Sequence, residues 1–334
     1  MRGIDIHTHF IPASFPRYAG TGSDVPWPSM EPGECGHAHV MISGKIYRTV
    51  PETSWSAAPR IRAMDEMTVA RQVISPMPEL LSYWLPADDG QALVRFLNEQ
   101  LAELVRRHPD RFDALGAVPL QDVGRAIDEL EYVSEQLGLP GVEIATHVNG
   151  VSIGDPRFEP FFAAAERLGA AIFVHALHPA GRERLVGAAA QEQVVAFPGD
   201  VALGIASLIT GGTLERHPDL RIAFSHGGGA FALLLPRMQH AWRSMPNIAE
   251  SLPRGPEEYA RRLYYDTLTY SARSLRFVID TFGADRMIMG SDYPFQIRDR
   301  DPLGSLGQLG LDRDTADAIC ERNARRFLGL TDAE

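Results

Sequence analysis

Two histidines near the amino terminus, His7 and His9, are separated by one residue and lie at the end of a short apolar run. Alternate residues of a β-strand point to the same face, so the two imidazoles would converge on one point, as two ligands of one metal ion must. An edge strand with two solvated histidines has the same spacing, and the pair alone does not decide between the two interpretations. The deciding residues lie much further along the chain.

Three more residues with metal-binding or proton-carrying side chains occur where apolar segments end, namely His175, His226 and Asp292. Three imidazoles and one carboxylate, from His7, His9, His175 and Asp292, suit Zn²⁺ with a water completing the shell, and another divalent transition metal would accept the same set. Asp292 could instead be a general base beside the metal. His226 could be a fourth nitrogen ligand or the group that handles the proton of the water.

The elements that must position these residues follow a regular order. Helical patterns separate most of eight short apolar segments, which lie near residues 3, 72, 114, 141, 170, 220, 263 and 286. Strands that are apolar throughout, rather than alternating, predict a parallel sheet covered on its outside, and eight such units predict a closed (β/α)₈ barrel. A doubly wound open sheet is the alternative, but no GxGxxG follows the first strand. The candidate residues would then share the carboxyl-terminal rim of the barrel, where function resides in this fold.

A long segment rich in Pro, Gly and Ser, residues 11–58, follows the first strand and predicts an insertion near the mouth of the site. Within it, residues 40–48 predict a small hairpin that turns at a Ser-Gly pair. Cys35, His37 and His39 have CxHxH spacing and could bind a metal. With no fourth partner nearby, a loop that lines the mouth is the favoured interpretation.

The single lysine bears on the number of metal ions. Of the 32 Lys and Arg residues only Lys45 is a lysine, and it lies in the early insertion. Two-metal sites in barrels of this type commonly bridge their ions with a carbamylated lysine on the fourth strand, where this chain offers Glu143. A mononuclear site is therefore favoured. Glu143 could bridge two ions, or it could be a carboxylate paired inside the barrel mouth.

Composition limits the class of protein. The 334 residues are 45% hydrophobic with a net charge of −11, which suits one large core, so we expect residues 1–334 to form a single domain. No basic block is present, which argues against a nucleic-acid partner. No uninterrupted apolar run reaches about 18 residues, which predicts no membrane span. Two cysteines make no disulfide framework, and with no signal-peptide pattern they predict a cytoplasmic protein.

Together, several motifs resemble the amidohydrolase superfamily in its decarboxylating branch, over about residues 3–330. The stretches that carry the resemblance are His7-Thr8-His9, His175, Ser225-His226-Gly-Gly-Gly and Gly290-Ser291-Asp292-Tyr293-Pro294. The resemblance implies one zinc ion, with His226 hydrogen-bonded to the metal water as the acid–base group. It implies four metal ligands: His7, His9, His175 and Asp292.

The resemblance also implies how a substrate is held. Arg48 and Arg237 would bind the carboxylates of a small anionic substrate, with Arg237 reaching the site of a neighbouring subunit in a homodimer. An Arg fork suits a carboxylate because it binds in bidentate fashion, although each arginine could instead form a surface salt bridge. The implied reaction is non-oxidative decarboxylation of an unsaturated or aromatic carboxylic acid, with 2-amino-3-carboxymuconate 6-semialdehyde or a close analogue as the favoured substrate.

The chemistry is reasonable on the residues alone. A metal ion lowers the pKa of bound water toward about 7, and His226 is suited to take and return that proton. A proton delivered to the carbon that bears a carboxylate lets the carboxylate leave as CO₂, with no oxidant or organic cofactor. A hydrolase of the lactonase type and a hydratase are the enzymatic alternatives. Structural zinc is the non-enzymatic one, but such sites are closed and rich in cysteine.

Overall fold

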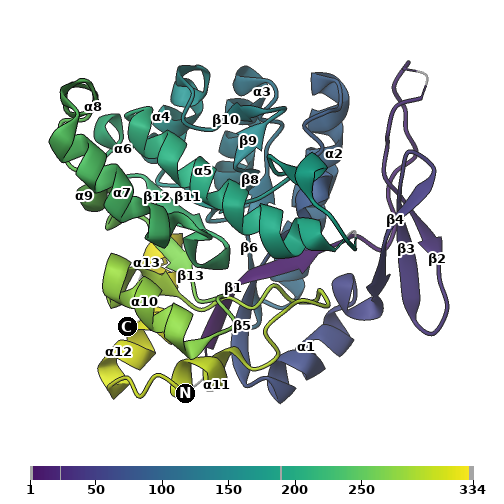
Figure 1. The fold of residues 1–334 in the computed structure, drawn as a ribbon. Coiled ribbons are helices and arrows are strands. Elements are labelled where there is room, and N and C mark those ends of the chain that lie inside the picture. The colour runs from purple at the N-terminus through teal and green to yellow at the C-terminus, as the bar shows by residue number, and fades with distance from the viewer. Residues whose placement is uncertain (1–2, 23, 189, 331–334) are drawn as a thin grey trace.

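The computed structural model describes residues 3–22, 24–188 and 190–330. Within them, eight parallel strand positions form the wall of a barrel (Figure 1). One of these positions is interrupted at Leu115 and comprises two short strands, β6 and β7. The strands are β1 (Gly3–Phe10), β5 (Val69–Pro76), β6 (Phe112–Ala114) with β7 (Gly116–Ala117), β8 (Gly141–Ala145), β11 (Ala171–His175), β12 (Arg221–Phe224), β13 (Tyr264–Asp266) and β14 (Met287–Ile288).

The strands pair in chain order, and the sheet closes between its first and last members. In the first ladder, β5 lies between β1 and β6. The second ladder runs in the order β7, β8, β11, β12, β13 and β14. At the closing seam, the amide of Ile6 donates to the carbonyl of Met289 at 2.9 Å, and the amide of Asp292 donates to the carbonyl of His7 at 2.8 Å. The predicted (β/α)₈ barrel is therefore confirmed, and the open sheet was the wrong alternative. All eight residues of β1 are buried, as a strand covered on both faces requires.

Helices cover the outside of the barrel (Figure 1). The helix that begins at Phe231 continues past Pro236 to Ser244, because Pro236 gives up one hydrogen bond while its neighbours Leu235 and Gln239 still bury side chains. The main helices are α1 (Ala57–Glu66), α2 (Ala87–Arg107), α3 (Val123–Glu131), α4 (Glu159–Leu168), α5 (Phe197–Thr210), α7 (Phe231–Ser244), α10 (Ala272–Phe282), α11 (Pro302–Gly307), α12 (Arg313–Asp317) and α13 (Asn323–Leu328).

The early insertion forms a three-stranded antiparallel sheet beside the barrel, at the right of Figure 1. Its strands are β2 (Ser29–Pro32), β3 (His37–Ile42) and β4 (Lys45–Pro51). The predicted hairpin is β3–β4, and its turn residues Ser43 and Gly44 have φ values of 54° and 70°, as a tight hairpin turn requires. The third strand, β2, was not predicted.

One helical stretch, Glu192–Thr210, is long and apolar enough by composition to cross a membrane, with 19 residues and a mean hydropathy of 1.5. The sequence criterion missed it because Asp200 interrupts the apolar run. Half of the stretch is buried inside the structure, and Val201, Ile205 and Leu208 belong to the main core. A helix that covers a barrel has the same composition, so this stretch is weak evidence for a span.

Candidate metal centre

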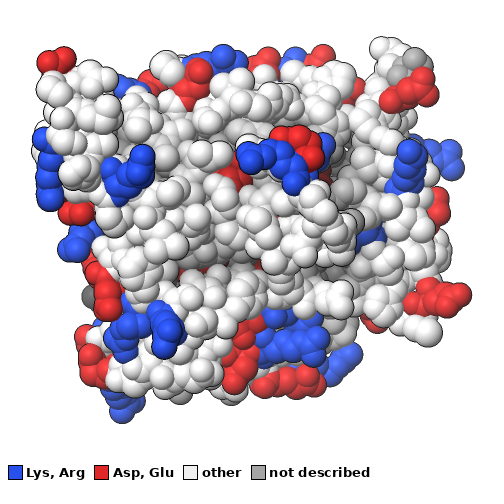
Figure 2. All heavy atoms as spheres, in the orientation of Figure 1, with Lys and Arg blue, Asp and Glu red and all other residues white. Residues whose placement is uncertain are grey.

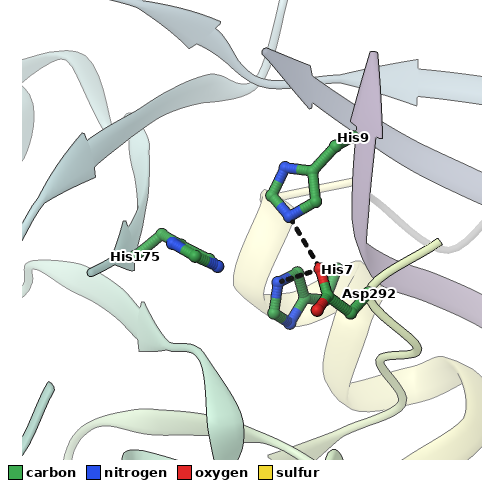
Figure 3. Close-up of side chains that lie close together, drawn as sticks. All are labelled: His7, His9, His175 and Asp292. Atoms are coloured by element: carbon green, nitrogen blue, oxygen red, sulfur yellow. Dashed lines mark ion pairs between the residues drawn. The ribbon is translucent and has the colours of Figure 1, made fainter. Parts of the chain in front are cut away.

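Four predicted ligands meet at the rim of the barrel (Figure 3). His7 and His9 come from β1, His175 ends β11, and Asp292 follows β14. All four are buried, and one ligand atom from each lies within 4.8 Å of the others. Asp292 Oδ1 is 3.6 Å from Nε2 of His7 and 3.1 Å from Nε2 of His9. The structure thus brings together the whole predicted set, whose metal binding stays a prediction.

Each histidine of the group is oriented by a hydrogen bond at Nδ1. His7 Nδ1 lies 2.6 Å from a carboxylate oxygen of Asp266, and His9 and His175 place Nδ1 at 3.3 and 2.8 Å from main-chain carbonyls. A carbonyl oxygen only accepts, so Nδ1 carries the proton and Nε2 keeps its lone pair for the centre of the group. This arrangement is typical of metal-binding histidines.

The centre of the group needs a cation. Nε2 of His7, Nε2 of His9 and Oδ1 of Asp292 are buried and have no hydrogen-bond partner among the described residues. When the His7 ring is neutral, these three atoms present lone pairs to one another, so a positive charge from a metal ion, or from a second proton on His7, stabilises the group. Three imidazole nitrogens and one carboxylate oxygen suit zinc and related divalent transition metals. The residues present therefore fit the implied metal ion.

Asp266, the last residue of β13, was missed by the sequence analysis. Its carboxylate accepts the Nδ1 proton of His7 and the main-chain amides of His226 and Gly227, the latter two at 2.9 and 2.7 Å. Burial opposes its charge, but the hydrogen bond with His7 holds the pKa of Asp266 below its usual value. Burial likewise lowers the pKa of His7, yet the carboxylates around it, Asp266 foremost, raise that pKa to about 9. A signal was available, because Asp266 lies close to the end of the strand predicted near residue 263.

His226 lies beside the group but outside it. Its ring centroid is 5.0 Å from that of His175 and 5.3 Å from that of His7, and its Nδ1 is buried without a described partner. Burial, reinforced by the charge of His7, lowers the pKa of His226 to about 4. A neutral imidazole at pH 7 can accept a proton. His226 is not one of the four grouped ligands, and its acid–base role stays a prediction.

A cavity of about 700 Å³ opens beside the metal centre and suits a small ligand. Its charged residues, apart from those of the metal centre, include Arg48, Glu79 and Arg273, of which the sequence analysis had named only Arg48. Apolar side chains make up much of the remaining wall, among them Phe197, Leu233, Leu268, Phe277, Val278 and Phe295.

The two predicted substrate arginines differ in position. Arg48, on β4, lines the cavity with its guanidinium 4.3 Å from the ring centre of Phe295 and 3.5 Å from Glu79. Arg237, on α7, is exposed and does not line this cavity, and it makes no hydrogen bond or ion pair with the described part of the chain. A role for Arg237 in the site of a neighbouring subunit stays a prediction.

Glu143 is paired inside the barrel mouth, the simpler of the two interpretations. The Ser75 hydroxyl donates to Oε2, which lies 4.0 Å from Nδ1 of His9, and burial raises the pKa of Glu143 to about 7. It lies outside the group of four ligands. No described residue offers a second cluster of at least three metal-binding side chains.

The expectation that Cys35, His37 and His39 line the mouth is wrong. Cys35 and His37 are exposed, His39 is half-buried with Nδ1 2.9 Å from the Thr49 hydroxyl, and none of the three lines the cavity. In the antiparallel pairing, His39 lies opposite Thr49 rather than Arg48. It is β4 that contributes to the cavity, through Arg48.

Charged side chains on the molecular surface do not gather in one large patch on the face that Figure 2 draws. Figure 2 shows small groups of acidic and basic side chains scattered over the face drawn, with a broad uncharged area between them. On that face the described residues form no continuous basic surface, which nucleic-acid binding would need.

The chain belongs to the amidohydrolase family, whose sequence profile matches residues 4–330. It is 33% identical to 2-amino-3-carboxymuconate-6-semialdehyde decarboxylase of Dictyostelium discoideum, a match that covers 98% of this chain and 91% of that protein. The crystal structure of 5-carboxyvanillate decarboxylase from Sphingomonas paucimobilis is similar, with 25% identity and a TM-score of 0.77, over 84% of this chain and 85% of that one.

A dihydroxybenzoic acid decarboxylase from Polaromonas sp. JS666, 22% identical, has the same fold with a TM-score of 0.76 over 84% of this chain and 89% of that one. That structure contains manganese and the inhibitor 2-nitroresorcinol. The relationships identify this chain as an enzyme of the carboxy-lyase class and confirm the resemblance drawn from its motifs.

Proposed function

We propose that this enzyme removes CO₂ without oxidation from an unsaturated or aromatic carboxylic acid, with 2-amino-3-carboxymuconate 6-semialdehyde or a close analogue as its substrate. The observation that carries the proposal is the buried group of His7, His9, His175 and Asp292 beside a neutral His226, at one end of a mostly apolar cavity. The similarity to decarboxylases that act on such acids supports it.

One metal ion, zinc or another divalent transition metal, would be held by His7, His9, His175 and Asp292. When bound, it would make a water molecule acidic enough to supply a proton near neutral pH. His226 takes and returns that proton, because burial keeps its imidazole neutral. Asp292 could additionally serve as a base. The apolar side chains of the cavity wall would limit the access of water to the reacting carbon.

The reaction needs no redox partner. A proton is added to the carbon that bears the carboxylate, so a new C–H bond forms. The C–C bond to the carboxylate then breaks, its electron pair returns to the unsaturated system, and CO₂ leaves. Arg48 would hold a carboxylate of the substrate by a bidentate contact. Arg237 would do the same in the site of a second subunit, which makes the enzyme a homodimer.

The same proposal extends to the location and the partners of the enzyme. We place the enzyme in the cytoplasm as one domain spanning residues 1–334, acting on a small anionic substrate with neither nucleic acid nor membrane as a partner. The cysteine usage and the acidic composition support this placement.

The test is to load the purified protein with zinc and follow the semialdehyde by absorbance and by mass. We expect the absorbance to fall while one CO₂ is released per substrate. A product that has gained the mass of water would indicate a hydrolase or a hydratase, and the proposal would then be wrong. Elemental analysis of the same preparation checks for one metal ion per chain.

A further inference from the structure

Glu79 is a buried acidic residue of the cavity wall that the proposed chemistry does not use. It lies in the short helix η2 (Pro78–Leu81) directly after β5 and is 2% exposed. Its Oε1 accepts a hydrogen bond from the Tyr47 hydroxyl at 2.5 Å and one from Arg48 at 3.5 Å. Its Oε2 is buried and has no hydrogen-bond partner among the described residues. The wall therefore contains an acceptor that its own neighbours leave unsatisfied.

The unsatisfied oxygen changes what Arg48 can bind. The Glu79 carboxylate already balances the charge of Arg48, and both residues line the cavity. A substrate carboxylate that binds Arg48 therefore adds a second negative charge beside Glu79 in a mostly apolar wall. A hydrogen-bond donor on the substrate would relieve this repulsion and would satisfy Oε2 at the same time.

We infer that Glu79 is a specificity-determining residue, which selects carboxylic acids that carry an amino or hydroxyl group near the carboxylate held by Arg48. This inference deepens the proposed function and rests on it for the identity of the site. A site built to bond an N–H or O–H group discriminates strongly against an analogue without it, because its buried polar atom is then left unpaired. The hydrogen bonds to Oε1 fix the orientation of the Glu79 carboxylate, and Oε2 accepts the hydrogen bond from the amino or hydroxyl group of the substrate.

The test measures binding rather than turnover, so that it does not depend on CO₂ release. Benzoates with an amino or hydroxyl group at each ring position are compared with matched methyl or fluoro analogues by calorimetry on the metal-loaded enzyme. We expect the best donor-bearing acid to bind at least about tenfold more tightly than its matched analogue. Equal affinities for every pair would overturn the inference.

The decisive variant is Glu79→Gln, which keeps the size of the side chain. Tyr47 and Arg48 would hold the amide oxygen, so the NH₂ group would occupy the place of Oε2 and donate instead of accept. We expect the preference for donor-bearing acids to vanish or reverse, and an undiminished preference would refute the role of Glu79. Glu52→Gln, which removes one carboxylate from an exposed position outside the cavity, is the matched control and should bind like the wild type.

The two levels of the argument fail separately. If no acid releases CO₂ but the donor preference is present and depends on Glu79, the proposed reaction is wrong and the selectivity stands. If CO₂ is released but the preference is absent, the reaction stands and the inference about Glu79 is wrong. Should Glu79→Gln not fold, equal affinities for the matched acids on the wild-type protein would still overturn the inference.

Discussion

The barrel rim and the three-stranded sheet serve the same cavity but are built differently. Every residue of β1 is buried, whereas in β4 only Val50 is buried. Hydrogen bonds to neighbouring strands orient His7 and His9 at the rim, while Arg48 and Glu79 hold each other in the cavity wall. The rim is part of the core and the sheet is an added layer. Changes at the rim should therefore affect metal and turnover, and changes in the sheet should affect substrate affinity alone.

The largest effect is expected at His226 of the rim. His226→Ala should lower turnover by about 10²–10⁴-fold because it removes the proton carrier, while the metal stays bound and the fold is intact. Kinetics with elemental analysis and circular dichroism would measure this. Loss of the metal as well would show that His226 is a ligand.

Asp266 offers a smaller change at the same rim. Asp266→Asn should weaken metal binding by about 10–100-fold, because the amide no longer fixes the Nδ1 proton of His7. Competition with a chelator above pH 9, where His7 is deprotonated in both proteins, gives the affinity. An unchanged affinity would mean that His7 is oriented by its packing alone.

The pH dependence of metal binding should reflect the same hydrogen bond between His7 and Asp266. Asp266 and its neighbours raise the pKa of His7 to about 9, and only the deprotonated ring can bind a metal. The apparent metal affinity should therefore increase with pH by up to about tenfold per unit and level off near pH 9. Chelator competition across this range tests it, and a flat profile would contradict the shift in pKa.

Arg48, on β4, tests whether a change in the three-stranded sheet affects substrate affinity alone. Arg48→Ala should raise KM for the acid substrate by about tenfold, since a charged hydrogen bond is lost, and should leave the metal content unchanged. Steady-state kinetics and elemental analysis provide both values. A fall in metal content would break the distinction between rim and sheet.

The smallest effect is expected at the hairpin turn of the sheet. Gly44 has φ +70° with open space around its Cα, so Gly44→Ala would cost only about 1 kcal/mol of backbone strain. Proteolysis of the sheet should become faster while turnover stays near that of the wild type. A marked loss of turnover would indicate that the sheet and the rim are coupled.

The sequence was informative where local pattern decides structure. Apolar runs located the barrel strands, and the polar side chains at or just after their ends gave the group of His7, His9, His175 and Asp292. Asp266 obeys the same rule but was passed over, because its partner His7 lies 259 residues away and no local pattern links the two.

Regions outside the barrel strands were predicted less well. Strand β2 is short and has no buried residue, so its sequence carries no alternation of apolar and polar positions. The role proposed for Glu79 could not be predicted from the sequence either. In the sequence, Glu79 is only an acidic residue that follows a strand. The structure is needed to show that Tyr47 and Arg48 donate to one of its two oxygens and leave the other without a described partner.

The barrel seam determines when, during translation, the group of four predicted ligands can form. His7 and His9 belong to the first strand, Asp292 follows the last, and the amide of Asp292 bonds the carbonyl of His7. During translation, His7 and His9 are therefore made well before Asp292, so the four predicted ligands can meet only after β14 has been made. A product that stops before Asp292 would lack one of these four side chains.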